Sequence, residues 1–264
     1  MAEISDYNRY GEELEKLLLL RTSPLALKLL EREEDTPAGA VRPQRDRGIH
    51  LAQCQVFAMA RRQKVTVAMF REDHWCWAPL IGYGLVQCNA GDPGFQDICE
   101  RLFVQNVELA KEHLSNRFPR LEFGKYAGLV CGPLRGVNYP PDLVLIYSNT
   151  AQLRHLLLAV KYATGSLLAS QFDPIDSCVF SVVPAITKNE YRITLPDPGE
   201  YERAMAGEDE IIFSIPQAKL GELMAGLRHF EDSKRGYATF APNLQPDFPQ
   251  PDFYRQLFKL WGLQ

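Results

Sequence analysis

The segment Asp142–Tyr147 (DLVLIY) constrains the fold of this chain more than any other stretch. It is a short, almost uninterrupted apolar run between Pro140-Pro141 and Ser148-Asn149, and such a run is typical of a buried β-strand. The residues after it place apolar side chains at helical spacing: Leu153, Leu156, Leu157 and Val160. A buried strand that leads into an amphipathic helix predicts an α/β fold of the mixed α+β kind.

Similar patterns cover most of the chain. Further strands are expected at residues 24–30, 64–70, 125–131, 166–172, 191–195 and 210–215. Helices are expected at residues 7–20, 49–62, 79–86, 94–118, 150–162, 200–206 and 216–230. Residues 24–30 would also suit a helix, and residues 179–186 suit either a helix or a strand. The alternation predicts a single domain over residues 1–264.

Two stretches lack such a pattern. Residues 31–48 mix charges of both signs with two prolines, and a loop of this length is either an exposed linker or part of a site. Residues 231–264 are rich in proline and aromatic residues, with a last helix expected near 253–263. We expect this tail to pack on the body or on a second subunit, and so to support a homo-oligomer or bind a partner protein.

The order strand, helix, strand, cysteine occurs twice. It ends at Cys76 in the first half (residues 22–90) and at Cys178 in the second (residues 140–190). An offset of 102 residues aligns these cysteines, but the identity is no higher than chance, so the order of elements is the evidence. We expect two strand-helix-strand halves related by a pseudo-twofold axis, with Cys76 and Cys178 in equivalent loops at a cleft.

Several segments together resemble a known group. They are TSPLALKLL at 22–30, CQVFAMARR at 54–62, GKYAGLVCGPL at 124–134, PPDLVLIYSNTAQLRHLL at 140–157 and GEDEIIFSIP at 207–216. In this order the chain resembles domain-of-unknown-function family 169, a conserved group in anaerobic bacteria and archaea. The resemblance implies a cytoplasmic α/β protein without an assigned activity. Many relatives carry a further cysteine where this chain reads ITLPDPGEYERAMAG, so a cluster that used it is not expected here.

The overall charge excludes some classes of partner. The net charge is −4 and basic residues are spread along the chain, so we expect no nucleic-acid binding. No apolar run reaches the roughly 18 residues of a membrane span, and the first residues do not resemble a secretory signal. We therefore expect a cytoplasmic protein with no membrane contact. Its six cysteines should be reduced, and none forms a C-x-x-C pair.

Cys76 is the first candidate for chemistry. It lies between Trp75 and Trp77, and His74 lies two residues before it. On an extended backbone His74 and Cys76 point to the same side, so the imidazole could activate the thiol. We therefore name Cys76 and His74 as candidate catalytic residues. The competing interpretation is a buried structural cysteine packed between tryptophans.

Further residues are candidates for binding a ligand or cofactor. Cys54 and Cys178 would join Cys76 if a metal or iron–sulfur site were built from distant thiolates, although their spacing resembles no metal motif. Arg61 ends a helix and could hold a carboxylate or phosphate. Asn149 and Gln152 lie where a buried strand becomes a helix, a place where α/β proteins often bind ligands. Core packing, a solvated face and helix capping are the competing interpretations.

Three functions remain open from the sequence. The first is binding of a small molecule or cofactor in a cleft near the Cys76 and Cys178 loops. The second is a thiol- or iron–sulfur-dependent enzyme of anaerobic metabolism that uses Cys76. The third is a non-catalytic accessory subunit whose aromatic tail docks to a partner. The sequence contains no phosphate-binding glycine loop, nucleophile elbow or zinc-protease motif that would name a reaction.

Overall fold

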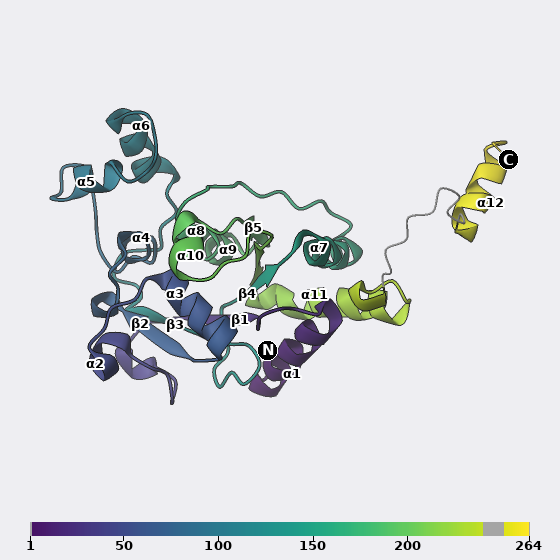
Figure 1. Ribbon diagram of the computed structural model, residues 1–264, viewed down its shortest axis with the longest axis horizontal. Helices are drawn as coiled ribbons and strands as arrows, with labels where there is room; N and C mark the ends of the chain where they lie inside the picture. Colours follow the sequence, from purple (N-terminus) through teal and green to yellow (C-terminus); the bar gives the residue numbers. More distant parts are fainter. Residues whose placement is uncertain (1, 240–250, 264) are drawn as a thin grey trace.

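One antiparallel sheet organises the structure. The computed structural model describes residues 2–239 and 251–263. In this part of the chain six strands pair in the order β2-β3-β1-β4-β6-β5 (Figure 1). They are β1 (Leu25–Leu30), β2 (Val67–Phe70), β3 (Gly128–Pro133), β4 (Leu143–Ser148), β5 (Arg192–Thr194) and β6 (Ile211–Pro216). The expected mixed α/β class is confirmed, and the sheet is antiparallel throughout.

Alternating side chains give the sheet two buried faces. In β1, Leu25 and Leu27 point into one core, and Ala26 points into the other. In β4, Leu145 and Ile146 divide between the two cores in the same way. Because both faces are buried, the central strands are apolar at successive positions, and this is why DLVLIY is so clear in the sequence.

Helices cover both faces. The face covered by α1, α7 and α11 is called here the α7 face, and the other the α3 face. The helices of the α7 face are α1 (Ile4–Leu18), α7 (Thr150–Thr164) and α11 (Gln217–Asp232). Those of the α3 face are α3 (Gln53–Ala58), α4 (Trp77–Gly82), α5 (Phe95–Cys99), α6 (Val107–Glu112), α8 (Ser177–Phe180) and α9 (Val183–Lys188). The remaining helices are α2 (Pro43–Arg47), α10 (Pro198–Arg203) and α12 (Asp252–Leu260). Short π-helical turns, Met59–Gln63 and His113–Arg117, extend α3 and α6.

The long helix expected at residues 94–118 is wrong. The segment instead forms α5, an irregular stretch, and α6 with its π-helical turn. Phe103 adopts a left-handed backbone with φ of 53°, which breaks the helix. Asn106 then starts α6, because its side-chain oxygen accepts the Leu109 amide at 2.9 Å.

The strand expected at residues 166–172 is also wrong. This segment has no strand structure, and Leu167 in it is 90% exposed. Ser170 instead serves the edge strand β5 through its hydroxyl, which accepts from the Ile193 amide at 3.0 Å and donates to the Ile193 carbonyl at 2.8 Å. The proposed alignment of the two halves therefore loses its last strand. Cys76 follows β2 while Cys178 precedes β5, so the two cysteines do not occupy equivalent loops.

A different correspondence appears in the sheet itself. The order β1-β3-β2 on one side repeats as β4-β6-β5 on the other. Leu25 lies opposite Pro133, and Leu143 lies opposite Pro216. The outer strands keep the same register, since Val67 lies opposite Cys131, two residues before Pro133, and Arg192 lies opposite Ser214, two residues before Pro216.

The loop at residues 31–48 is tied to the body. Arg42 is only 1% exposed, and its guanidinium contacts the carboxylates of Asp73, Glu33 and Glu72. Asp73 is fully buried and also accepts the amide of Gln44 at 2.8 Å. A buried cation with three acidic partners therefore holds a segment that composition alone would assign to a linker.

The C-terminal tail starts later than expected. α11 extends to Asp232, and the Tyr237 ring packs on His155 at 5.4 Å between centroids. Residues 240–250, which the expected tail includes, lie outside the described residues. The following helix α12 has no buried residue and lies apart from the sheet and its helices (Figure 1).

Candidate functional site

α4 and α8 meet through an unusually close contact. Cys76 is the residue before the first turn of α4, and Cys178 lies in the first turn of α8. A Cβ atom at Gly82 would lie 2.5 Å from a methyl carbon of Val179, so only glycine allows this approach. The Tyr83 hydroxyl donates to the Cys178 carbonyl at 2.7 Å. These contacts bring the loops of Cys76 and Cys178 together, although they are far apart in the sequence.

Cys54 reaches the same place from α3. Its thiol donates to the Gly199 carbonyl at 3.8 Å, which joins α3 to α10. Cys54 and Cys76 also pack in one small apolar cluster with Ala52 and Ala204. Cys54, Cys76 and Cys178 all line one pocket of about 590 Å³, called here the thiol pocket. The structure thus places together the three cysteines that the sequence analysis singled out.

The wall of the thiol pocket contains polar groups without partners. Gln53 is fully buried, and neither its amide nitrogen nor its amide oxygen has a hydrogen-bond partner. One carboxylate oxygen of Asp176 is likewise buried and unpaired. The guanidinium of Arg203 lies 4.9 Å from the centre of the Trp75 ring at the same pocket. A buried amide left unpaired costs about 1–3 kcal/mol, so such a group is rare without a reason.

The Ser177 hydroxyl links two carboxyl groups, that of Asp197 in the pocket lining and that of the buried Glu200. The hydroxyl lies 2.6 Å from an oxygen of Glu200 and 3.0 Å from one of Asp197. Asp197 also caps α10 by accepting the Glu200 amide at 2.9 Å. Burial raises the pKa of Glu200 to about 7. Burial and the charge of Asp197 raise the pKa of Asp176 to about 7 as well. Near neutral pH the carboxyl groups of Glu200 and Asp176 can therefore either donate or accept a hydrogen bond.

The thiols themselves are protonated at neutral pH. Burial raises the pKa of Cys54 to about 12, with Glu200 and Asp197 adding to the effect. Burial also raises the pKa of Cys76 and Cys178. A thiol in this state is a weak nucleophile, because the thiolate is the reactive form.

His74 does not activate Cys76 in this arrangement. Its ring is 6% exposed, and neither ring nitrogen has a hydrogen-bond partner. Burial lowers the pKa of His74 to about 4, so the imidazole is neutral. His74 is absent from the lining of the thiol pocket. Its backbone forms an isolated β-bridge with Leu51. His74 and Cys76 therefore do not form a hydrogen-bonded Cys–His pair of the kind used in nucleophilic catalysis.

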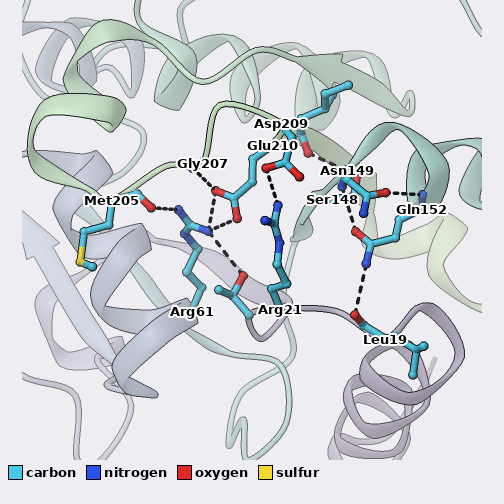
Figure 2. A network of polar contacts seen from close by, with 12 residues as sticks. Leu19, Arg21, Arg61, Ser148, Asn149, Gln152, Met205, Gly207, Asp209 and Glu210 are labelled. Atoms are coloured by element: carbon cyan, nitrogen blue, oxygen red, sulfur yellow. Dashed lines mark hydrogen bonds and ion pairs between the residues drawn. The ribbon is translucent and has the colours of Figure 1, made fainter.

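The remaining candidates, Arg61, Asn149 and Gln152, are absent from the lining of the thiol pocket. They belong to the network of polar contacts in Figure 2. Arg61 is buried and pairs with Glu210, with its nitrogen 2.9 Å and 3.0 Å from the two carboxylate oxygens. Asn149 caps α7 by accepting the Gln152 amide at 2.8 Å. The Gln152 side chain completes this capping box and donates to the Leu18 carbonyl at 2.9 Å. All three side chains are thus engaged in structural contacts.

The donor set does not fit a metal cluster. In the described part of the chain, no three His, Cys, Asp or Glu side chains are placed to hold one metal ion. The three thiols therefore share a pocket without forming a ligand set for a metal ion.

Gln53 and Asp176 are the site residues that sequence reasoning missed. Each lies within two residues of a cysteine that was singled out, Cys54 and Cys178 respectively. Neither residue type is unusual in its local sequence, because Gln53 begins a helix and Asp176 ends a loop. Their significance comes from burial without a partner, which is a property of the tertiary structure.

These features define a mixed α/β protein with one antiparallel sheet and a polar-walled thiol pocket beside it. The chain belongs to domain-of-unknown-function family 169, described as an uncharacterised ArCR, whose family model matches residues 13–226. It is similar to an uncharacterised protein of Methanocaldococcus jannaschii, with 21% identity over 233 residues that cover 86% of this chain and 96% of the relative. No solved structure matches the chain. Among the described residues, no helix combines the length and apolar character required to cross a membrane.

Proposed function

We propose that this protein binds a small planar molecule in the thiol pocket. The observation that carries the proposal is the side chain of Gln53, which is fully buried in the pocket wall with both polar atoms unpaired. A ligand that supplied one donor and one acceptor would satisfy the amide and recover its desolvation cost. The volume of about 590 Å³ is within the range of small-molecule sites.

The lining indicates the chemical class of this ligand. Trp75 and Trp77 offer aromatic surface, and Gln53 and Asp176 offer hydrogen bonds from the same pocket. Asp176, with a pKa raised by burial to about 7, can face either a donor or an acceptor. A heteroaromatic ring with adjacent N–H and carbonyl groups matches this combination of aromatic and amide partners.

Native mass spectrometry of the purified protein, followed by titration with uncharged ring compounds, tests the proposal. We expect either a retained small-molecule mass, or quenching of tryptophan fluorescence and a rise in Tm on adding riboflavin, pterin or hypoxanthine. Gln53→Met keeps the length of the side chain and removes its hydrogen bonds. We expect this variant to weaken binding by roughly 10-fold or more. Its ligand-free stability should not fall, since an unpaired polar group has been removed.

Gln96→Met is the matched control, because Gln96 is exposed on α5. It should bind as the wild type does. Absence of a retained mass and of binding by all three rings would contradict the proposal, as would equal binding by the Gln53→Met variant.

The second candidate is a non-catalytic subunit that associates through its C-terminal tail. Its support is α12, where Phe253 is 65% exposed, Trp261 beyond the helix is 61% exposed, and no residue is buried. A cytoplasmic location is part of both candidates. It is supported by six free cysteines, which is typical of a reducing compartment.

We also propose that the two halves of the sheet arose by duplication, in an alignment different from that expected. The support is the repeated strand order and the matching positions of Pro133 and Pro216. In this alignment Cys54 in α3, before β2, corresponds to the region of Cys178 in α8, before β5. A crystal structure in which the strands of the two halves failed to superpose would contradict it.

A further inference from the structure

A second pocket lies beside the thiol pocket, across α8. Its volume is about 860 Å³, and it is formed by the π-helical turn after α6, by α9 and by β5. Cys178 in α8 lines the thiol pocket, and Phe180 in the same helix lines this one. The Trp77 ring of the thiol pocket contacts the Phe118 ring of the second pocket at 5.5 Å between centroids. The two pockets therefore share a wall, but their linings contain different chemistry.

The second pocket is strongly cationic and is called here the arginine pocket. Its lining includes the basic residues Arg117, Arg120, Lys188 and Arg192. The acidic residue in the lining is Asp173, whose carboxylate lies 3.6 Å from the His113 ring. Such an excess of positive charge over a concave surface attracts anions.

Arg192 is a buried cation of the arginine pocket with few polar partners. It is 6% exposed on the edge strand β5, and its guanidinium makes one hydrogen bond, to the Gln171 carbonyl at 3.3 Å. Its Nε atom is buried without a partner. Across residues 2–239 and 251–263, no carboxylate lies within 4.0 Å of it. A buried cation without a counter-ion carries a large desolvation cost.

Arg120 repeats this pattern in the same pocket. Its guanidinium donates to the carbonyls of Cys88 at 2.9 Å and Leu114 at 2.6 Å, while its Nε atom remains unpaired. Burial lowers the pKa of Arg120, which fits a cation lacking an acidic neighbour. Within the part of the chain that the structure describes, neither the Arg120 nor the Arg192 guanidinium pairs with a carboxylate, and this points to a ligand that brings negative charge.

Aromatic rings stand next to these cations. Phe118 and Phe180 meet edge to face at 6.0 Å between centroids, and Phe172 is 57% exposed at the same pocket. From these contacts we propose that the arginine pocket binds a phosphorylated small molecule that also carries a planar ring. The guanidinium fork matches the tetrahedral oxygens of a phosphate, and the exposed ring of Phe172 offers a stacking surface.

Isothermal titration of the full chain with adenosine 5′-monophosphate, inorganic phosphate, adenosine and benzoate tests this inference. Adenosine 5′-monophosphate should bind most tightly, phosphate more weakly, and adenosine and benzoate weakest. Binding should also weaken as sodium chloride is raised, because the contact is ionic. Arg192→Met removes the charge and keeps the apolar stem, and should weaken binding of the monophosphate by roughly 10- to 100-fold.

Two further variants make the result decisive. Lys188→Met alters an exposed side chain of the pocket and should weaken binding several-fold even if Arg192→Met fails to fold. Arg47→Met, at the exposed end of α2, should leave binding unchanged. The inference is overturned if the monophosphate does not bind, if Lys188→Met and Arg47→Met bind it equally well, or if benzoate binds better than the monophosphate.

Discussion

Asp176 combines three features at one residue of the thiol pocket. Its backbone is left-handed with φ of 55°, one of its carboxylate oxygens is buried and unpaired, and its pKa is raised to about 7 by burial and by Asp197 and Asp173. In the unfolded chain an aspartate has a pKa near 3.9. The folded protein therefore binds this proton more tightly, and Asp176 makes folding less stable as the pH rises from about 4 to 7.

Asp176→Asn should remove this cost. Asparagine has the shape of the protonated acid and tolerates the left-handed backbone. We expect the variant to be more stable than the wild type at pH 8, by about 1–2 kcal/mol. This is less than the full pKa difference would give, because Asp176 keeps part of its surface in solvent. At pH 4 the two proteins should be nearly equal. Urea unfolding at both pH values measures the difference.

Asp232→Asn, at the exposed end of α11, is the control and should change little at either pH. A gain for Asp176→Asn that was the same at pH 4 and pH 8 would show that the carboxyl of Asp176 is not protonated by the fold.

At the scale of elements, a buried ion pair joins the end of α3 to the start of β6. Arg61 lies in the π-helical turn after α3, is 2% exposed, and stacks 4.0 Å from the Tyr147 ring. Glu210, just before β6, is 4% exposed and accepts two hydrogen bonds from the Arg61 guanidinium, one on each carboxylate oxygen (Figure 2). Removing one partner of such a pair leaves the other buried and uncompensated.

Glu210→Gln should therefore lower the free energy of unfolding by about 3–5 kcal/mol. The neighbouring pair Arg21–Asp209 provides the control, since its side chains are 52% and 57% exposed. Asp209→Asn should cost no more than about 1 kcal/mol. Urea unfolding of the two variants compares the same chemical change one residue apart. Equal losses would show that burial of the Arg61–Glu210 pair contributes nothing.

Elements with a strong local signal could be predicted from the sequence, and elements decided by neighbours could not. β4 is buried on both faces and therefore leaves a continuous apolar run, DLVLIY, in the sequence. α7 is buried on one side and therefore leaves leucines at helical spacing. Residues 94–118 keep a helical pattern across a break that depends on the left-handed Phe103. Residues 166–172 have the sequence pattern of a strand but do not pair with β5 through their backbone. The Ser170 side chain instead bonds the amide and the carbonyl of Ile193 in β5.

The candidate site was predictable in location and not in composition. Cys54, Cys76 and Cys178 were recognisable as residue types that carry chemistry, and they share one pocket. Their convergence needs the contact of Gly82 with Val179, which no local pattern encodes. Gln53 became a candidate only through burial without a partner, and Arg192 only through the absence of a nearby carboxylate.

For the whole molecule, the antiparallel sheet places the sites on one side. Helices α1, α7 and α11 cover the α7 face with apolar contacts, while α3, α8 and α9 on the other face carry residues of both pockets. Trp77 lines the thiol pocket, Phe118 lines the arginine pocket, and their rings contact each other, so a ligand bound against one ring would lie next to the wall of the other pocket. The α3 face is therefore the part of the fold where ligand effects should be sought.

The tail adds a prediction about assembly. α12 and the residue that follows it place a stripe of apolar side chains at helical spacing, formed by Phe253, Leu257, Leu260 and Trp261. Asp252 and Lys259 lie seven residues apart on the side of α12 away from this stripe, so two antiparallel copies of α12 would meet through their apolar side chains. A symmetric contact of this kind pairs the stripe with itself. We therefore propose that the occupant of the stripe is the α12 of a second copy of this chain.

Removing residues 240–264 tests this assembly, because α11 and the Tyr237 contact with His155 remain. Light scattering after size exclusion should give about twice the chain mass of 30.0 kDa for the full protein and the monomer mass for the truncated one, with Tm of the body unchanged. Phe253→Ser with Trp261→Ser should also dissociate the dimer, while Lys259→Ser, on the polar side of α12, should not. A monomeric full-length chain would refute self-association through α12, and a dimer that survives truncation would place the interface on the body.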